Sequence, residues 1–290
     1  RGDAGRTSGR SFRPSTCEMS NPQRSRRQTL PIFVLTLTGS ERRRASLLAA
    51  LKSHELDYEL FFGVDGRNGL PAQYEHLVDR SARVNNIRRP MTDGEYACAL
   101  SHLLIYRQMV TRELARALIL EDDAIIGSFV ADLACGNIPV VGDLMLLDHD
   151  RGLFRRSGQR TIAPKLTAYR IAVAPDLATG YVIALRMATR LLKDALPVRQ
   201  VSDWPAVIER GKAYAVYPRI VDHPDPDKGP SELRSERDSL NTAFAKTKPR
   251  KSGKINRIFT RAYWKRQLRK KLYYPLDPEV RLNPPNGAKR

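Results

Sequence analysis

The chain has 290 residues, of which 41 % are hydrophobic, and this is enough for one large α/β domain or two small ones with a buried core. Its formal net charge is +19, but the charge is unevenly distributed: residues 1–29 carry +5, residues 239–276 carry +12 and residues 30–238 only about +1. Because the central part is nearly neutral, the charge argues against a specific nucleic-acid-binding domain, although the basic flanks can contact nucleic acid non-specifically.

The three cysteines, Cys17, Cys98 and Cys135, have neither a paired nor a metal-type spacing. We therefore predict no disulfide framework and no zinc site, and expect a reducing, cytoplasmic location. The sequence has no run of eighteen apolar residues and no signal-peptide core at its beginning, so we expect neither a membrane span nor export by that route.

The composition divides the chain into three regions. Residues 1–29 are rich in Arg, Ser, Gly and Pro and have little to bury, which predicts a disordered basic tail. Residues 30–238 contain the elements of a catalytic domain. Residues 239–290 form a basic C-terminal extension.

Residues 30–38 form an apolar, β-branched run that predicts a central strand. Ser40 is expected to cap the helix that follows, and Arg42 and Arg43 lie in the first turn of this helix. Cations at a helix N-terminus oppose its dipole, which is tolerable where an anionic ligand binds. A solvated charge run is the alternative.

A second strand is predicted at residues 58–64, and it ends at Asp65 and Gly66, which completes a β-α-β unit. Residues 70–89 are weakly periodic and predict irregular structure. Thr92 and Glu95 have the spacing of a capping box, which predicts the start of a helix that extends to about residue 112.

Residues 117–123, Ala-Leu-Ile-Leu-Glu-Asp-Asp, organise the rest of the chain. The apolar residues predict a buried strand, and Glu121, Asp122 and Asp123 follow at its carboxyl end, where open α/β sheets bind ligands. Adjacent carboxylates repel one another unless a cation is present, and oxygen ligands suit Mg²⁺ or Mn²⁺. The sequence therefore predicts a metal site that holds phosphates; a solvated acidic turn is the alternative.

A second apolar strand, residues 140–147, delivers Asp148 and Asp150 to the same expected edge. Residues 151–164 are basic and contain glycine, which predicts a loop over the site. His223 can be read as a metal ligand or as a surface histidine. The remaining predicted elements are a helix at 124–133, strands at 167–173, 179–184 and 213–216, and a helix at 186–194.

Basic and apolar residues alternate with helical spacing in residues 250–275. This pattern is typical of a helix that lies on an anionic membrane surface, so we predict peripheral attachment to the inner face of the cell membrane. A surface helix packed on the core is the alternative.

The residues leave several functions open. A metal at the carboxylates would clamp the diphosphate of a nucleotide donor during glycosyl transfer. A Mg²⁺-dependent phosphotransfer enzyme is a second possibility, but the chain has no GxxxxGK[ST] loop to hold phosphates. A non-catalytic, basic α/β protein associated with membrane or nucleic acid would leave the three acids unexplained.

The sequence resembles glycosyltransferase family 25, the family of bacterial lipopolysaccharide and lipooligosaccharide galactosyltransferases. The resemblance runs from about residue 31 to 223. Five blocks in order carry it: Ile-Phe-Val-Leu-Thr-Leu at 32–37 with Arg42 and Arg43 after it, Phe-Gly-Val-Asp-Gly at 62–66, Thr92 to Glu95 through Ser101 and His102, residues 117–123, and Thr-Gly-Tyr at 179–181.

This resemblance implies an α/β fold of the GT-A-like nucleotide-diphosphosugar transferase type, with a central, mostly parallel sheet and here a basic C-terminal helix. It also implies a UDP-sugar donor, with galactose as the favoured sugar. The transfer to a glycan or glycolipid hydroxyl would be inverting and would be assisted by Mn²⁺ or Mg²⁺. The donor-binding residues that it implies are Thr38, Arg42, Arg43, Asp65, Gly66, Ser101 and His102, with Glu121, Asp122 and Asp123 at the metal.

Inverting transfer needs a carboxylate that takes the proton of the acceptor hydroxyl. Asp203 is the predicted base because it lies late in the domain, where a GT-A acceptor site forms. Asp148 and Asp150 are the alternatives.

Overall fold

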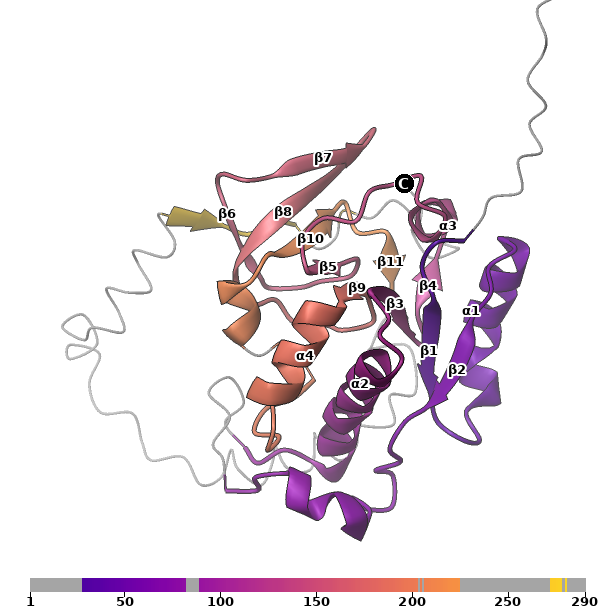
Figure 1. Ribbon diagram of the computed structural model, residues 1–290, viewed down its shortest axis with the longest axis vertical. Coiled ribbons are helices and arrows are strands. Elements are labelled where there is room, and N and C mark those ends of the chain that lie inside the picture. Colours follow the sequence, from indigo (N-terminus) through magenta and orange to yellow (C-terminus); the bar gives the residue numbers. More distant parts are fainter. Residues whose placement is uncertain are drawn as a thin grey trace, which may run out of the picture.

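The computed structural model describes residues 28–81, 89–202, 204, 206–224, 272–277 and 280. Helices pack on both faces of a central sheet, which confirms the predicted α/β class (Figure 1). The strands are β1 (Ile32–Thr36), β2 (Glu59–Phe62), β3 (Arg116–Glu121), β4 (Ile125–Ile126), β5 (Leu144–Leu146), β6 (Leu153–Arg155), β7 (Arg160–Ala163), β8 (Leu166–Val173), β9 (Gly180–Ala184), β10 (Ala213–Tyr217), β11 (Val221–Asp222) and β12 (Tyr273–Tyr274). The α-helices are α1 (Glu41–Ser53), α2 (Asp93–Thr111), α3 (Ser128–Ala134) and α4 (Leu185–Asp194), and the 3₁₀-helices are η1 (Ala72–Leu77) and η2 (Ala206–Arg210).

The sheet is mixed and partly parallel, with the strand order β12-β6-β8-β10-β5-β9-β3-β1-β2 and with β7 paired to β8. Strand β1 lies between β2 and β3 and is parallel to both. Strand β9 is antiparallel to both β3 and β5, so β3 and β5 point in the same direction. The ends of β1, β3 and β5 therefore meet along one edge of the sheet, which we call the carboxyl edge.

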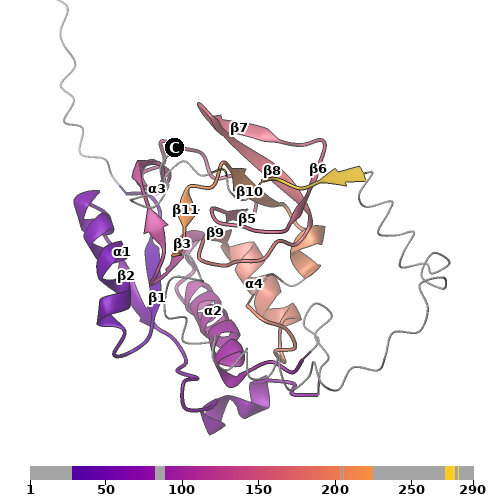
Figure 2. The same cartoon turned by 180° about the vertical axis from the view of Figure 1, so that it is seen from behind.

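The two faces of the sheet bury alternate residues of the same strands. Phe33 of β1 and Ile119 of β3 belong to the hydrophobic cluster that includes α2 and α4. Val34 and Leu120, their neighbours in sequence, belong to the cluster that includes α1 and α3. Figures 1 and 2 show α2 and α4 side by side on one face and α1 on the other. Burial on both faces explains the continuous apolar runs of these strands.

The predicted capping box of α2 is confirmed. The Glu95 N–H donates to Thr92 Oγ1 at 3.1 Å, and the Thr92 N–H donates to Glu95 Oε2 at 2.9 Å. Glu95 also forms a buried ion pair with Arg89. Ser40, by contrast, precedes α1 without a side-chain capping bond, because its ψ of 34° departs from the extended conformation that such a cap adopts.

The prediction of a loop at residues 151–164 is wrong, since this segment contains β6 and β7. Both strands pair with β8, an eight-residue strand that also pairs with β10. Their pairing is non-local, and Phe154 and Ile162 are buried by it. Local composition, which is basic and contains glycine, cannot reveal a long partner strand further along the chain.

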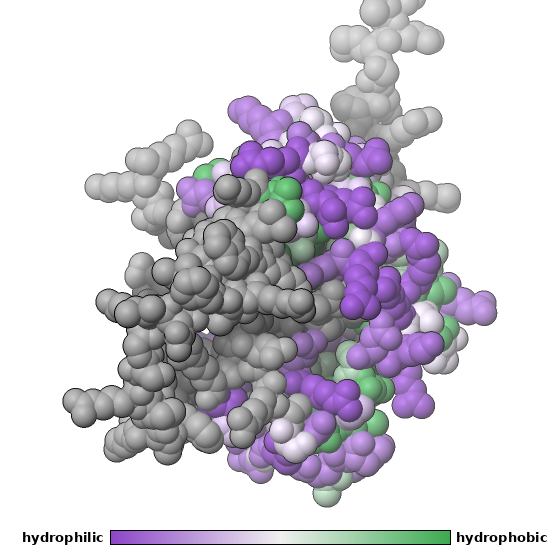
Figure 3. Space-filling model, turned by 90° about the vertical axis from the view of Figure 1, so that its left-hand side faces the viewer, coloured by the Kyte–Doolittle hydropathy of each residue, from purple (hydrophilic) through white to green (hydrophobic). Residues whose placement is uncertain are grey.

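Most of the basic extension, including nearly all of residues 250–275, lies outside the described residues, as do residues 1–27 of the predicted tail. Among the described helices, none has the length and apolarity needed to cross a bilayer. Figure 3 shows one face of the molecule, on which hydrophilic residues cover most of the described surface and hydrophobic ones form small separate groups.

Candidate active site at the carboxyl edge

Asp122 is buried at the end of β3 and joins three elements. Its Oδ2 accepts a hydrogen bond from Thr36 Oγ1 of β1 at 2.8 Å, and its Oδ1 accepts one from Arg43 Nε of α1. The side chain is 8 % exposed. Because protein groups occupy both oxygens, Asp122 fixes the position of Arg43 and is the least available of the three acids for a metal.

Asp123 is the acid with an open oxygen. Its Oδ2 accepts from Arg43 Nη2 at 2.7 Å, whereas its buried Oδ1 has no hydrogen-bond partner among the described residues. Burial, together with repulsion by Glu121 and Asp122, raises the pKa of Asp123 to about 6. A buried polar atom without a partner is uncommon and costly, so this oxygen is suited to a cation.

Glu121 turns away from the other two acids, toward α2. Its Oε1 lies 3.2 Å from Nε2 of His102, and the other ring nitrogen of His102 lies 2.7 Å from the Tyr181 hydroxyl. Burial opposes the charged forms of both residues, but hydrogen bonds with Cys98 and Glu121 raise the pKa of His102 to about 10, and His102 lowers the pKa of Glu121. Glu121 and His102 thus form an ion pair in which His102 is buried and Glu121 is partly buried.

Asp148 follows β5 and reaches the same edge, as predicted, but it is fully buried. Its Oδ1 accepts from Arg219 Nη1 at 2.7 Å, and its Oδ2 lies 2.8 Å from His223 Nδ1. Burial alone would raise the pKa of Asp148, but the hydrogen bond with His223 and the charges of His223 and Arg219 lower it. Asp148 therefore cannot contact a substrate directly, and its place in the site is to hold His223.

His223 reaches the site through the small sheet formed by β4 and β11, which pairs residues 125–126 with residues 221–222. A Cβ on Gly180 of β9 would lie 2.8 Å from a methyl group of Val221, so glycine is needed for this close approach. The hydrogen bond with Asp148 raises the pKa of His223, and the charge of His223 acts on Asp123. The sequence analysis slightly favoured a surface histidine here, because the pairing of β4 and β11 is not visible in the sequence.

The loops after β1 and β2 are tied together at the same edge. Arg67 donates to the backbone oxygen of Thr38 at 2.9 Å and pairs with Asp65 at 2.6 Å, which lowers the pKa of Asp65. A Cβ on Gly66 would lie 2.8 Å from the Asp93 carbonyl oxygen, so this glycine lets the loop pack on the start of α2. Arg67 is a site residue that the sequence analysis missed.

The other predicted site residues lie in different settings. Ser101 is buried and links α2 to the β2 loop, since it accepts from the Val64 N–H and donates to the Ala97 carbonyl. Arg42 is exposed on α1. Asp150 pairs with Arg151. Asp203 lies outside the described residues, but its neighbours Ser202 and Trp204 line a cavity beside His102.

The carboxyl edge fits a hard divalent ion at Asp123. Among the described residues, Asp123 offers a carboxylate oxygen without a partner, and Arg43 offsets only one of the two negative charges of Asp122 and Asp123. Glu121 could join this site only by leaving His102. Of the three acids, Asp123 is therefore the one whose setting best fits a metal ligand, and Asp122 holds Arg43 beside it.

The raised pKa of Asp123 predicts a pH-dependent effect of the metal on stability. In the metal-free protein, ionisation of Asp123 destabilises the fold as the pH rises through about 6, because the folded-state pKa lies above the ordinary value of 3.8. A bound cation removes this penalty, and below that pH it must compete with a proton. We expect Mn²⁺ to raise the melting temperature clearly above a pH of about 7 and little below a pH of about 5. Scanning calorimetry with Mn²⁺ and with EDTA tests this; an equal shift at both pH values would contradict it.

Comparisons with known proteins show which family the chain resembles. The family model described as "Glycosyltransferase family 25 (LPS biosynthesis protein)" matches residues 29–204. The chain is similar to procollagen galactosyltransferase 1 of Danio rerio, at 29 % identity over 178 residues, which cover 59 % of this chain and 29 % of the relative. It is also similar to procollagen galactosyltransferase 2 of Homo sapiens, at 32 % identity over 95 residues, which cover 32 % of this chain and 15 % of the relative.

A further relative is the "Probable inactive glycosyltransferase 25 family member 3" of Rattus norvegicus, which is 35 % identical over 95 residues, or 32 % of this chain and 17 % of the relative. In these three comparisons the matched segment spans less than a third of the relative's own length. The family model covers more than half of this chain and includes β1, the helix of His102 and the acids at the end of β3. The chain belongs to glycosyltransferase family 25.

Proposed function

We propose that the protein transfers a hexose, with galactose favoured, from a UDP-sugar to a hydroxyl of a glycan or glycolipid acceptor of the lipopolysaccharide or lipooligosaccharide type. The observation that carries this proposal is the buried carboxylate oxygen of Asp123, which lies near Arg43 at the carboxyl edge and has no partner in the part of the chain that the structure describes. Two relatives are named as galactosyltransferases, and the family description names lipopolysaccharide biosynthesis, which favours this donor and acceptor.

The residues around Asp123 would bind the donor. Arg43 lies in the first turn of α1, directly after β1, so its guanidinium and the N-terminus of the helix offer positive charge to a diphosphate. The loops that Arg67 ties together, with Thr38 and Asp65, would lie against the nucleoside. A Mn²⁺ or Mg²⁺ ion held by Asp123 would supply Lewis acidity that offsets the charge of the departing diphosphate.

Inverting transfer also needs a group that removes the proton of the acceptor hydroxyl. Asp203 remains our proposal for this base, and its neighbours Ser202 and Trp204 border the cavity near His102. His223 is the second candidate, because Asp148 holds its Nδ1 and leaves Nε2 able to accept a proton. In this arrangement Asp148 is a positioning residue.

We also propose a cytoplasmic location, with residues 250–275 against the anionic inner face of the cell membrane. The support for it is the basic, amphipathic sequence of that segment, which suits an acceptor carried by a lipid.

A non-catalytic function is the second candidate. It is favoured by the relative whose name describes it as inactive, and by the ion pair that occupies Glu121. A protein of this kind would use its carboxyl edge, if at all, to bind a nucleotide without turnover. A Mg²⁺-dependent phosphotransfer enzyme has less support, because the chain lacks the phosphate-binding loop.

Isothermal titration with UDP tests the donor class. We expect the full chain to bind UDP in Mn²⁺ and to lose this binding in EDTA, with GDP and ATP binding at least about tenfold more weakly, a difference of about 1.4 kcal/mol. Equal binding of all three nucleotides would point to a general phosphate site. No binding of any nucleotide would refute the transferase proposal.

The variant Asp203→Asn separates donor binding from transfer. If Asp203 is the base, this variant keeps Mn²⁺-dependent UDP binding and loses release of UDP from UDP-galactose in the presence of an oligosaccharide acceptor. The matched variant His223→Gln tests the second candidate in the same assay. Full turnover by Asp203→Asn would exclude Asp203 as the base, and absence of turnover in the unmodified chain, with UDP binding intact, would favour the non-catalytic function.

A further inference from the structure

Three side chains of different chemistry meet beneath the carboxyl edge. They are Cys98 and His102 of α2 and Glu121 of β3, and one donor atom of each lies within 4.8 Å of the other two. Cys98 and His102 are four residues apart on one helix, so they project from the same face. The sequence analysis found no metal-type spacing for this cysteine, because the third ligand comes from a strand and not from a nearby segment of sequence.

The spacing suits a small tetrahedral ion. Two light-atom ligands at about 2.0 Å from a tetrahedral zinc ion are roughly 3.3 Å apart, and His102 Nε2 lies 3.2 Å from Glu121 Oε1. The Cys98 sulfur lies within 4.8 Å of both of these atoms. A set of one sulfur, one nitrogen and one oxygen is unsuited to Mg²⁺ and suited to Zn²⁺, which accepts all three.

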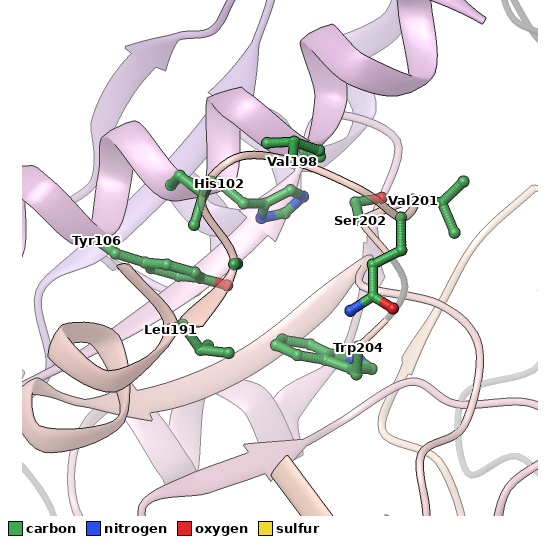
Figure 4. A pocket seen from close by; sticks show the side chains of 11 residues that line it. His102, Tyr106, Leu191, Val198, Val201, Ser202 and Trp204 are labelled. Atoms are coloured by element: carbon green, nitrogen blue, oxygen red, sulfur yellow. The ribbon is translucent and has the colours of Figure 1, made fainter. Parts of the chain in front are cut away.

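The surroundings supply what such a site requires. The Tyr181 hydroxyl lies 2.7 Å from His102 Nδ1, so it fixes the ring and leaves Nε2 to face Glu121. A cavity of about 40 Å³ lies beside the cluster, lined by His102, Ser202 and Trp204 (Figure 4). This volume has room for a water molecule, and Ser202, which accepts a hydrogen bond from Cys98 at 3.4 Å, lies at its wall.

We propose that Cys98, His102 and Glu121 form a binding site for one Zn²⁺ ion, with the fourth ligand, a water molecule, on the side of the cavity. This site is separate from the oxygen site of Asp123. Zinc replaces the proton of the Cys98 thiol and the proton between His102 and Glu121, so that binding releases both protons to solvent and changes no oxidation state.

The proposed zinc site also gives Glu121 a role. A carboxylate that ligates zinc together with His102 is held away from Asp123, so the two ions do not share it. The expected stoichiometry is one thiophilic ion at Cys98 and one hard ion at Asp123, and Mn²⁺ should not displace the former. This inference does not depend on transferase activity.

Cobalt titration tests the proposal, since Co²⁺ occupies zinc sites and gives a ligand-to-metal charge-transfer band in the near ultraviolet when a thiolate is bound. We expect the full chain to develop this band with one equivalent of Co²⁺, to lose it on addition of one equivalent of Zn²⁺ and to keep it in excess Mn²⁺. We expect Cys98→Ser to lose the band, and the double variant Cys17→Ser, Cys135→Ser, which removes the other two cysteines, to keep it.

Circular dichroism of Cys98→Ser shows whether the near-isosteric variant remains folded. His102→Gln is a second test, because it removes the nitrogen ligand but leaves the thiol, and we expect at least a tenfold weaker affinity for Co²⁺. The proposal is overturned if the unmodified chain gives no band, if the folded Cys98→Ser variant keeps it, or if the cysteine double variant loses it.

Discussion

Replacing Asp123 with asparagine is expected to weaken Mn²⁺-dependent UDP binding by roughly 100-fold, or about 2.8 kcal/mol. Asparagine keeps the size of the side chain and its hydrogen bond to Arg43 through the amide oxygen, but it removes the negative charge that attracts the cation. Titration of UDP in Mn²⁺ and in EDTA measures the change, and only the affinity for UDP in Mn²⁺ should fall.

The stability of the same variant distinguishes a lost ligand from a damaged fold. Asp123 is a partly desolvated carboxylate with a raised pKa, so its neutralisation should leave the metal-free melting temperature at pH 7 unchanged or higher. The control is Asp194→Asn on α4, where an exposed acid pairs with Arg190 at 3.7 Å. Undiminished UDP affinity in Asp123→Asn would remove Asp123 from the metal site.

Replacing Arg219 with methionine should destabilise the protein by about 3–5 kcal/mol, the usual effect of removing one partner from a buried ion pair. Arg219 is 3 % exposed and Asp148 is 0 % exposed, so the remaining carboxylate has no access to water. The side chains of His223 and Thr179 would be left as hydrogen-bond partners of Asp148. Urea unfolding at pH 7 measures the loss.

The matched control is Arg190→Met, which removes an exposed cation from α4. Exposed pairs contribute about 0–1 kcal/mol, so this variant should unfold close to the unmodified protein. A loss below about 1 kcal/mol in Arg219→Met would mean that Asp148 becomes protonated or reaches water, and that the ion pair does not hold the site together.

The location of the site could be predicted from the sequence, but not its internal geometry. The apolar run that ends in Glu121, Asp122 and Asp123 required a buried strand, and parallel β1 and β3 place these acids at a ligand-binding edge. The directions of the three side chains depend on partners that are 19 to 86 residues away along the chain. No local pattern specifies that Glu121 faces His102 while Asp122 faces Thr36.

Dependence on partners that are distant along the chain also explains the residues whose setting the sequence analysis did not predict. Asp148 reaches the predicted edge, but its burial depends on Arg219, 71 residues further on. Strands β6 and β7 depend on β8, and the place of His223 depends on the pairing of β4 with β11. The role of Asp203 and the membrane contact of residues 250–275 remain predictions.

The bond between Arg43 and two adjacent acids has a consequence for the order of events. Without a metal, the guanidinium is a resident counterion that offsets one of the two negative charges of Asp122 and Asp123 before any ligand arrives. A divalent ion at Asp123 Oδ1 would weaken the attraction between this carboxylate and Arg43 Nη2, so that this arm of Arg43 could turn to a phosphate. We therefore expect ordered assembly, in which the cation enters first and thereby prepares the anion site for the nucleotide.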